Sequence, residues 1–197
     1  MAKNVFISFR FADGYAYKNR LANLFDAYND TVDYSEDQDR SRMSEETIRQ
    51  YLYKKLKRSS VTIVLLTPLA VNHNHNWRGE YDDWIYDEIR YSLEDRVGNN
   101  TNGLIAVYTP EAADMVMSKN DDSSICVKDV DNLFRKNMMN VKPLYKTNPS
   151  PGLYDRDYDS YCSLLSWSEF TGNIGKYIDI ATNKHNATYK YDIVKRL

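Results

Sequence analysis

The stretch Val61-Thr62-Ile63-Val64-Leu65-Leu66 decides the fold. It carries no charge, presents apolar side chains on both faces, and is rich in β-branched residues, which favour strands. Thr67-Pro68 ends it. A strand that is apolar on both faces is typical of the interior of a parallel sheet with helices on either side. We therefore predict the central strand of an α/β fold here.

Strands and helices alternate on both sides of this stretch. Three shorter strands are predicted, at Val5 to Phe9, Thr31 to Tyr34 and Leu104 to Tyr108. The segments between the strands repeat apolar residues at helical spacing. Their buried stripes are Tyr17, Leu21, Leu24, Phe25 and Tyr28; Ile48, Tyr51, Leu52 and Leu56; and Tyr81, Ile85, Ile89 and Leu93. This alternation predicts a parallel sheet that is built from right-handed crossover connections and covered by helices on both faces.

The pattern weakens after Pro110. Short helices are predicted over 112–117 and 127–134, a loop over 148–152, and a longer helix whose buried stripe is Phe170, Ile174, Tyr177, Ile178 and Ala181. The tail from Asn183 shows little pattern. A chain of 197 residues fits one domain with an elaboration. We expect a single domain over 1–197, with a core at about 4–110 and an elaboration over 111–197 that contains the C-terminal helix.

The charge balance and the hydropathy of the chain argue against two classes of partner, nucleic acids and membranes. The chain has 26 Lys and Arg against 28 Asp and Glu, a net charge of −2. This balance lacks the basic field that binds nucleic acid, so we expect no nucleic-acid partner. The longest apolar run is far shorter than the roughly 18 residues that cross a bilayer, so we expect no membrane partner. The start of the chain lacks the pattern of a secretory signal, which predicts a cytoplasmic location.

Ligands of open parallel sheets bind at the carboxyl ends of the strands. On that rim, Phe9, Arg10 and Asp13 follow the first predicted strand, and residues 35–42 and 67–77 follow the next two. We expect the binding cleft there. Neither GxGxxG nor GxxxxGK followed by Ser or Thr occurs, so a Rossmann dinucleotide site and a P-loop are excluded. A phosphate-accepting receiver domain is excluded too, because the strand ends lack its aspartates.

His73 and His75 lie two residues apart in a polar stretch and could chelate a metal ion. Zinc sites usually need a third protein ligand, and neither CxxC nor HExxH accompanies these histidines. We therefore expect no metal site. Nothing in the sequence around Cys162 marks an activated thiol, and we predict that this cysteine is inert.

Two stretches of the sequence carry distinctive motifs. Val5 to Arg10 reads VFISFR and is followed by Asp13. Residues 84–89 read WIYDEI, with Trp84 and Glu88 in the pattern W-x-x-x-E. Together the two motifs resemble the TIR domain family, whose first strand reads close to VFxSFR with an acidic residue shortly after it and which has W-x-x-x-E on a helix. Order and spacing of the two motifs agree with the family over Val5 to Tyr108.

Two further features fit the same family. Residues 35–42 stand where TIR domains have their BB loop, and VTIVLL stands where they have their central strand. The opening residues 1–9 and the chain length are most similar to the TIR-like proteins of the bacterial Thoeris anti-phage system. The resemblance implies an α/β fold of the flavodoxin-like kind, a three-layer sandwich with a central parallel sheet and helices on both faces.

The resemblance also implies a signalling enzyme. Catalytic TIR domains break the bond between nicotinamide and ribose in NAD, so NAD enters as the substrate and no cofactor is expected. Thoeris proteins of this kind are understood to make a cyclic ADP-ribose type second messenger, which reaches a separate effector as a diffusible nucleotide. The implied activity is that of an NAD nucleosidase or ADP-ribosyl cyclase in anti-phage defence.

The resemblance assigns roles to individual residues. Glu88 matches the catalytic glutamate of the family, and Trp84, one helical turn earlier, would shape the pocket. Arg10 could meet the pyrophosphate of NAD, and Phe9 could border the nucleotide. Asp13 could bind beside them or could instead brace the first helix.

Two alternatives stay open at this point. Residues 35–42 carry charges of both signs, as expected of a self-association contact that completes the site of a neighbouring copy, but a solvated loop fits equally well. The chain could also be a non-catalytic TIR-like interaction module for signal transduction, without turnover. Glu88 together with Trp84 favours the enzyme, although a fold alone does not establish an activity.

Overall fold

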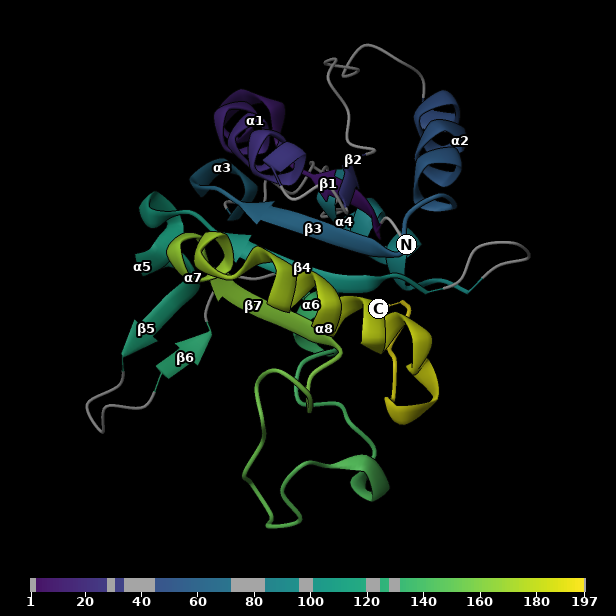
Figure 1. The fold of residues 1–197 in the computed structure, drawn as a ribbon, viewed down its shortest axis with the longest axis vertical. Coiled ribbons are helices and arrows are strands. Elements are labelled where there is room, and N and C mark those ends of the chain that lie inside the picture. The colour runs from purple at the N-terminus through teal and green to yellow at the C-terminus, as the bar shows by residue number, and fades with distance from the viewer. Residues whose placement is uncertain are drawn as a thin grey trace, which may run out of the picture.

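The computed structural model describes residues 3–27, 31–33, 45–71, 84–95, 101–119, 125–127 and 132–196. Its centre is a five-stranded sheet in which all pairs of neighbouring strands are parallel (Figure 1). The strands are β1 (Lys3–Ser8), β2 (Thr31–Asp33), β3 (Val61–Leu66), β4 (Gly103–Tyr108) and β7 (Cys162–Ser166). Their spatial order is β2-β1-β3-β4-β7. This is the flavodoxin-like order, so the predicted fold class is confirmed.

The middle strand β3 is buried along its whole length. Val61, Ile63 and Leu65 pack into the core on one face of the sheet, and Val64 and Leu66 pack into the core on the other. Two parallel neighbours, β1 and β4, pair with it along its edges. The strand predicted from VTIVLL therefore occupies the place expected of it.

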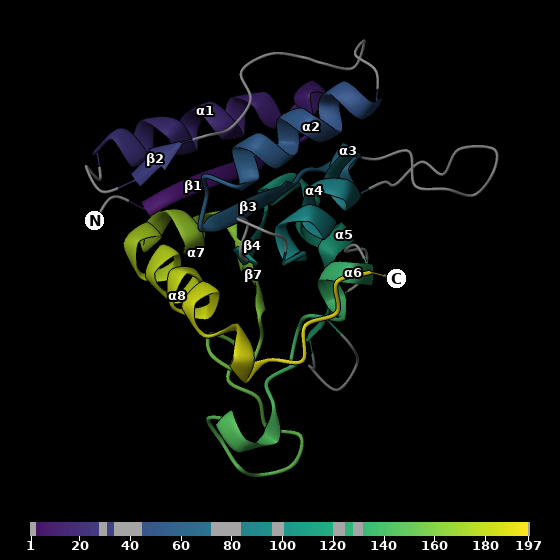
Figure 2. The same cartoon turned by 90° about the vertical axis from the view of Figure 1, so that its right-hand side faces the viewer.

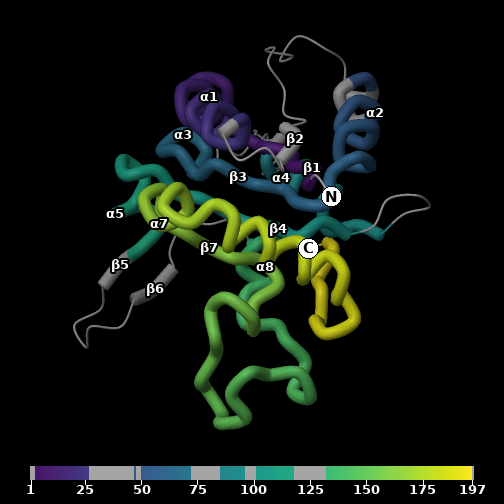
Figure 3. Tube along the Cα trace, viewed as in Figure 1, coloured from purple at the N-terminus to yellow at the C-terminus, as the bar shows by residue number. Residues whose placement is uncertain are grey.

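Helices cover both faces of the sheet, which Figure 2 shows between its two helical layers. One layer contains α1 (Phe11–Ala27), α7 (Trp167–Gly172) and α8 (Ile174–Asn186). The other contains α2 (Glu45–Leu56), α3 (Pro68–Val71), α4 (Trp84–Leu93), α5 (Ala113–Val116) and α6 (Asn132–Arg135). The chain tube in Figure 3 shows that the first helix and the last two helices share a layer although they are far apart in sequence. None of the described helices combines the length and hydropathy needed to cross a membrane.

The second half of the chain differs from the prediction. β7 was not predicted, yet it forms an edge of the main sheet beside β4. The helix predicted over 127–134 is wrong at its start, because Val127 belongs to the strand β6 (Ile125–Val127), which pairs with β5 (Met117–Lys119). The helical turn α6 begins only at Asn132.

The predicted C-terminal helix is two helices. Asn173 has non-helical backbone angles, φ −146° and ψ 45°, and separates α7 from α8. α7 begins at the N-cap Ser166, whose hydroxyl accepts a hydrogen bond from the backbone N–H of Glu169. The tail, for which little structure was predicted, continues α8 to Asn186 and adds the 3-10 turn η3 (Thr188–Lys190). Two further 3-10 turns are η1 (Pro110–Ala112) and η2 (Pro143–Tyr145).

We predict that Gly103→Ala destabilises the protein strongly. A Cβ at Gly103 would lie 2.1 Å from the carbonyl oxygen of Ala181 on α8, and the backbone of a helix cannot move aside cheaply. The free energy of unfolding, measured by urea denaturation, should fall by about 3 kcal/mol or more. Gly172→Ala is the control, because a Cβ there meets open space and should change stability by less than about 1 kcal/mol. Equal stability of the two variants would contradict the close approach of α8 to β4.

A lysine is buried between α8 and the edge strand. Lys184 is 3% exposed, and its Nζ donates a hydrogen bond to Ser163 Oγ on β7 at 2.7 Å. Burial lowers the pKa of Lys184 to about 8, because desolvation penalises the ammonium form; Cys162, Asp157 and Asp155 oppose this shift. The folded state therefore gives up this proton at a lower pH than the unfolded state does.

This shift predicts a pH dependence of stability. Below about pH 8 the folded state holds a buried ammonium, and between about pH 8 and 10 the unfolded state binds more protons, so the contribution of Lys184 to stability rises with pH. Relative to Lys184→Met, the wild type should gain about 2 kcal/mol of unfolding free energy from about pH 7 to about pH 9.5. Tyrosines also titrate at high pH and change the unfolding free energy, but they are the same in both proteins. The difference between parallel urea titrations of the two proteins therefore removes their contribution. A difference that stays constant with pH would show that Lys184 titrates normally.

Candidate functional site

The sheet has one point at which its strand order reverses. β1 and β3 are neighbours, and the chain runs from β1 to β2 on one side of this pair and from β3 to β4 on the other. In open α/β sheets the crevice outside the carboxyl ends of such strands binds the ligand. Here those ends are Ser8 of β1 and Leu66 of β3. The predicted rim residues that the structure describes lie at this point.

Asp13 ties the two strand ends together. One carboxylate oxygen, Oδ1, accepts a hydrogen bond from Thr67 Oγ1 at 2.7 Å, and Oδ2 accepts one from the backbone N–H of Leu69 at 2.9 Å. Asp13 lies in the first turn of α1, whereas Thr67 and Leu69 follow β3. Of the two roles that the sequence left open for Asp13, the structure shows the bracing of the first helix; binding of a ligand stays a prediction.

Thr67 was predicted on the rim but not as a site residue, and the short helix that follows it was not predicted. The buried Thr67 hydroxyl accepts a hydrogen bond from the N–H of Ala70 at 3.4 Å, and its carbonyl accepts one from Val71 at 2.9 Å. Thr67 is thus the N-cap of α3, with Pro68 in the first helical position. Threonine followed by proline is a known start signal for a helix, so the sequence contained the information.

Arg10 contacts the same group of residues, Asp13, Thr67 and Leu69, which we call the Asp13 clamp. Its Nη1 donates a hydrogen bond to the carbonyl oxygen of Leu69 at 3.0 Å, and its backbone carbonyl accepts from the N–H of Gly14 at 2.7 Å, the first bond of α1. The side chain is only half-buried. Arg10 and Asp13 therefore meet at Leu69, and a cationic group is presented at the carboxyl ends of β1 and β3.

Phe9 packs in the layer of α1. Its half-buried ring joins the core cluster on that face and lies 6.0 Å from the ring of Phe11 and 6.4 Å from that of Tyr15. Gly14 leaves room for this packing, because a Cβ there would lie 3.1 Å from the Cβ of Phe9, and Phe9 would have to shift by a few tenths of an ångström. Phe11 and Tyr15 are exposed, so a small aromatic surface flanks the strand ends on this side.

Glu88 lies in the opposite layer, in the middle of α4. Ile85 and Ile89, on either side of it along the helix, are buried in the core against β3 and β4. The Glu88 side chain is half-buried, and one of its carboxylate oxygens is shielded from solvent. The predicted catalytic residue is therefore a carboxylate in a partly dry environment on a helix anchored to the central strands.

Polar and aromatic contacts hold α4 in place. Ser92 Oγ donates to the backbone carbonyl of Glu88 at 2.7 Å and lies 2.8 Å from Thr62 Oγ1 on β3. Tyr91 is buried against α2, with its ring 4.4 Å from that of Tyr53. Burial raises the pKa of Tyr91, so its hydroxyl stays neutral. The position of Glu88 is thus set from both the sheet and the neighbouring helix.

Ser8 adds a polar group on the face toward α4. It follows Phe6 by two residues on β1 and therefore shares its face, where Phe6 packs with Tyr91 of α4. Ser8 is 1% exposed, and within the described part of the chain its hydroxyl has no hydrogen-bond partner. The sequence singled out Ser8 only as part of VFISFR, not as a candidate site residue.

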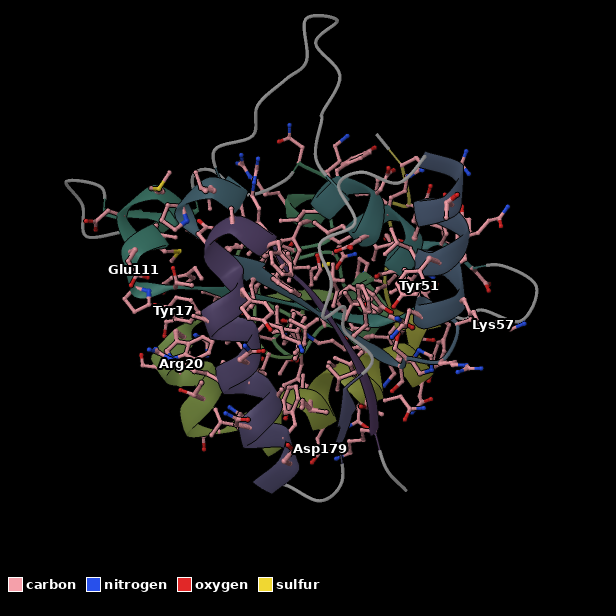
Figure 4. The ribbon with its side chains drawn as sticks, turned by 90° about the horizontal axis from the view of Figure 1, so that it is seen from above. Tyr17, Arg20, Tyr51, Lys57, Glu111 and Asp179 are labelled. Atoms are coloured by element: carbon pink, nitrogen blue, oxygen red, sulfur yellow. The ribbon has the colours of Figure 1, made fainter. Side chains whose placement is uncertain are left out.

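A second cluster covers the carboxyl ends of β4 and β7 on the side of α1. Tyr17 donates a hydrogen bond to the Glu111 carboxylate, at 2.8 Å to Oε2 and 2.9 Å to Oε1, and its ring meets that of Trp167 edge-on at 4.7 Å. The hydrogen bond from Tyr17 lowers the pKa of Glu111. Figure 4 shows Tyr17, Arg20 and Glu111 side by side along α1. This contact joins α1 to α7 and η1.

Several predicted features lie outside the described residues. Trp84 is the first residue of α4, but its side chain is not described, so its relation to Glu88 stays a prediction. The same holds for the proposed contact loop 35–42 and for His73 and His75. Among the residues that are described, no three His, Cys, Asp or Glu side chains gather as metal ligands would.

The comparison with known families agrees with this geometry. A sequence model of the family described as "Thoeris protein ThsB, TIR-like domain" matches residues 6–114, which is more than half of the chain. The matched segment contains residues 6–8 of β1, the Asp13 clamp, and all of β3, α4 and β4. It ends before β7, α7 and α8, which complete the sheet and one helical layer.

We predict that the Asp13 clamp stabilises the fold. Asp13→Asn replaces one acceptor oxygen by an NH₂ group that faces a donor, and it should lower the free energy of unfolding by about 2 kcal/mol. In a double-mutant cycle with Thr67→Val, urea denaturation should give a coupling of about 1 kcal/mol. Asp26→Asn, an exposed carboxylate on the same helix, should change stability by less than about 0.5 kcal/mol. A coupling near zero would mean that the two side chains do not share a hydrogen bond in solution.

Proposed function

Because the chain belongs to the family of the Thoeris protein ThsB, TIR-like domain, we propose that it is a signalling enzyme that cleaves the nicotinamide–ribose bond of NAD. Family membership connects it with Thoeris-related anti-phage signalling. The observation that carries the catalytic part of the proposal is Glu88, a half-buried carboxylate on a helix fixed to the central strand. Shielding from water strengthens the interaction of such a carboxylate with a developing positive charge.

The reaction makes modest demands on the protein. The bond between C1′ of the ribose and the ring nitrogen of nicotinamide breaks, and both electrons leave with the nitrogen, whose positive charge is thereby neutralised. The leaving group needs no general acid, in contrast to ordinary glycosidases with their two carboxylates. Positive charge builds up on the ribose, and the Glu88 carboxylate would stabilise it and bind the ribose hydroxyls.

Two groups can then attack C1′. Attack by water gives ADP-ribose, and attack by an adenine ring nitrogen of the same molecule gives a cyclic ADP-ribose; each route releases nicotinamide and one proton. We propose the cyclic route as the source of a diffusible nucleotide signal that acts on a separate effector. Since NAD is the substrate, a cytoplasmic location is part of the proposal.

The remaining predicted site residues have supporting roles. Arg10, half-buried beside the carbonyl of Leu69, would meet the pyrophosphate, and Phe9 and Trp84 would border the nucleotide. Asp13 would position Arg10 indirectly, because its carboxylate binds Thr67 and Leu69 in the segment after β3 that Arg10 contacts. Self-association through residues 35–42 belongs to the proposal as the means of completing the site.

We predict that Glu88→Gln abolishes NAD cleavage while the fold is kept. Purified protein, concentrated or crowded to encourage assembly, is incubated with NAD, and nicotinamide and the nucleotide products are measured by chromatography and mass spectrometry. Nicotinamide release should fall at least about 100-fold, because the charge that stabilises the transition state is lost. Asp87→Asn is the matched control: its carboxylate pairs with Arg90 on the same helix at 2.9 Å, and release should change less than about twofold.

Two outcomes would contradict the proposal. Nicotinamide release that is equal in the wild type and in Glu88→Gln would exclude the assigned catalytic role. No release by folded wild-type protein, even with lysate of phage-infected cells added as a trigger, would leave the non-catalytic interaction module as the function.

A further inference from the structure

Residues 142–160 form an arm that projects away from the sheet and its helices (green in Figures 1 and 2). Large apolar and aromatic side chains are exposed on this arm and on η3 beside it. Leu144 is 84% exposed, and none of the residues of η2, in which it lies, is buried. The other exposed side chains are Tyr145, Leu153, Tyr154, Tyr158 and Tyr189. Such side chains contribute little to the core, so their clustering calls for another explanation.

The arm is held in shape by two aspartates. The buried Asp159 accepts hydrogen bonds from the backbone N–H groups of Thr147 at 2.9 Å and Asp155 at 2.8 Å. Asp155 Oδ1 in turn accepts from the N–H groups of Asp157 and Tyr158, both at 2.9 Å. A surface built in advance in this way loses little conformational entropy when a partner binds.

The base of the arm is fixed as well. Lys142 N–H donates to the carbonyl of Lys190 at 2.9 Å, and the hydroxyl of Tyr191 donates to the carbonyl of Tyr158 at 2.8 Å. Val141 and Tyr191 form an isolated antiparallel bridge. The turn η3 therefore lies against the arm and adds its side chains to the same surface.

Negative and positive side chains of this region lie in different places. Carboxylates point inward: Asp155 and Asp159 bind backbone, and Asp157 pairs with Lys176 of α8 at 2.8 Å. Two ammonium groups, those of Lys146 and Lys190, lie over aromatic rings instead, although Lys146 Nζ also donates a hydrogen bond to the carbonyl of Ser150 at 2.6 Å. Lys146 Nζ is 4.3 Å from the ring centre of Tyr154, and Lys190 Nζ is about 6 Å from the ring centres of Tyr145 and Tyr189. The surface is thus cationic as well as aromatic.

We propose that this surface, the arm face formed by Leu144, Tyr145, Lys146, Tyr154, Tyr189 and Lys190, docks an acidic protein segment that also carries apolar side chains. Tyrosines provide large contact areas at low entropic cost and are enriched among residues that dominate binding energies. The lysines complement carboxylates at the rim, which favours encounter with an acidic partner over a basic one. This inference does not depend on the activity proposed for Glu88.

The arm face fits a protein segment better than a nucleic acid. The rings of Tyr145 and Tyr189 meet at 83°, so they do not form the parallel platform on which bases stack. Leu144, the most exposed of these side chains, offers an aliphatic contact but no stacking surface. The chain as a whole carries a net charge of −2 and so lacks the broad positive field that single strands require.

A random peptide library tests the proposal without knowledge of the natural partner. Twelve-residue peptides displayed on phage are selected against the full-length protein, and enriched peptides are synthesised and measured by fluorescence anisotropy. We expect peptides that combine Asp or Glu with Leu or aromatic residues. Their affinity should fall at least about tenfold in Tyr145→Ser and in Leu144→Ser, and about threefold in Lys190→Gln with a weaker dependence on salt.

Control variants and a nucleic-acid probe show which results would overturn the proposal. Tyr15→Ser replaces an equally exposed tyrosine on α1, and Lys57→Gln replaces an exposed lysine directly after α2; both should leave peptide affinity unchanged. Peptides without acidic residues, or peptides that bind Tyr145→Ser as well as the wild type, would overturn the proposal. So would binding of an oligothymidine probe that Tyr145→Ser abolishes, which would assign the arm face to nucleic acid. Thermal unfolding of each variant confirms that it is folded.

Discussion

The burial of β3 on both faces is the constraint on which the rest of the structure depends. A strand that exposes neither face to water needs a parallel neighbour along each edge and a helical layer on each side. The neighbouring strands are β1 and β4. One helical layer contains α1 and α8, and the other contains α4 and the short helices α3, α5 and α6. The strand order reverses between β1 and β3, and in open α/β sheets the carboxyl ends of the strands at such a point are where a ligand binds.

The polar groups around that opening are tied to structural elements. Asp13 joins the first turn of α1 to the start of α3, Arg10 contacts the same segment, and Glu88 belongs to a helix whose far end is also fixed. At that end the Arg196 guanidinium lies 3.0 Å from the largely buried carboxylate of Glu94. The C-terminal segment therefore reaches the helix that carries Glu88, although it lies outside the segment that matches the family.

The sequence predicted the elements whose burial leaves a clear pattern. Short apolar runs such as VTIVLL predicted the first four strands, and apolar residues at helical spacing, such as Ile85, Ile89 and Leu93, predicted α1, α2 and α4 but not α3. β7 was missed because CSLLS has only two large apolar residues between serines, and one of those serines, Ser163, is buried by bonding Lys184 from another element. The site shows the same division: strand order brought Arg10 and Asp13 to one rim, but the partners Thr67 and Leu69 depend on how α1 lies against β3.

The account rests on the claim that NAD binds at the carboxyl ends of β1 and β3 with its ribose beside Glu88. A crystal structure of the Glu88→Gln variant with NAD tests this most directly. The account predicts the nicotinamide ribose within hydrogen-bonding distance of residue 88 and the pyrophosphate beside Arg10. NAD bound elsewhere, with its ribose remote from residue 88, would contradict the account.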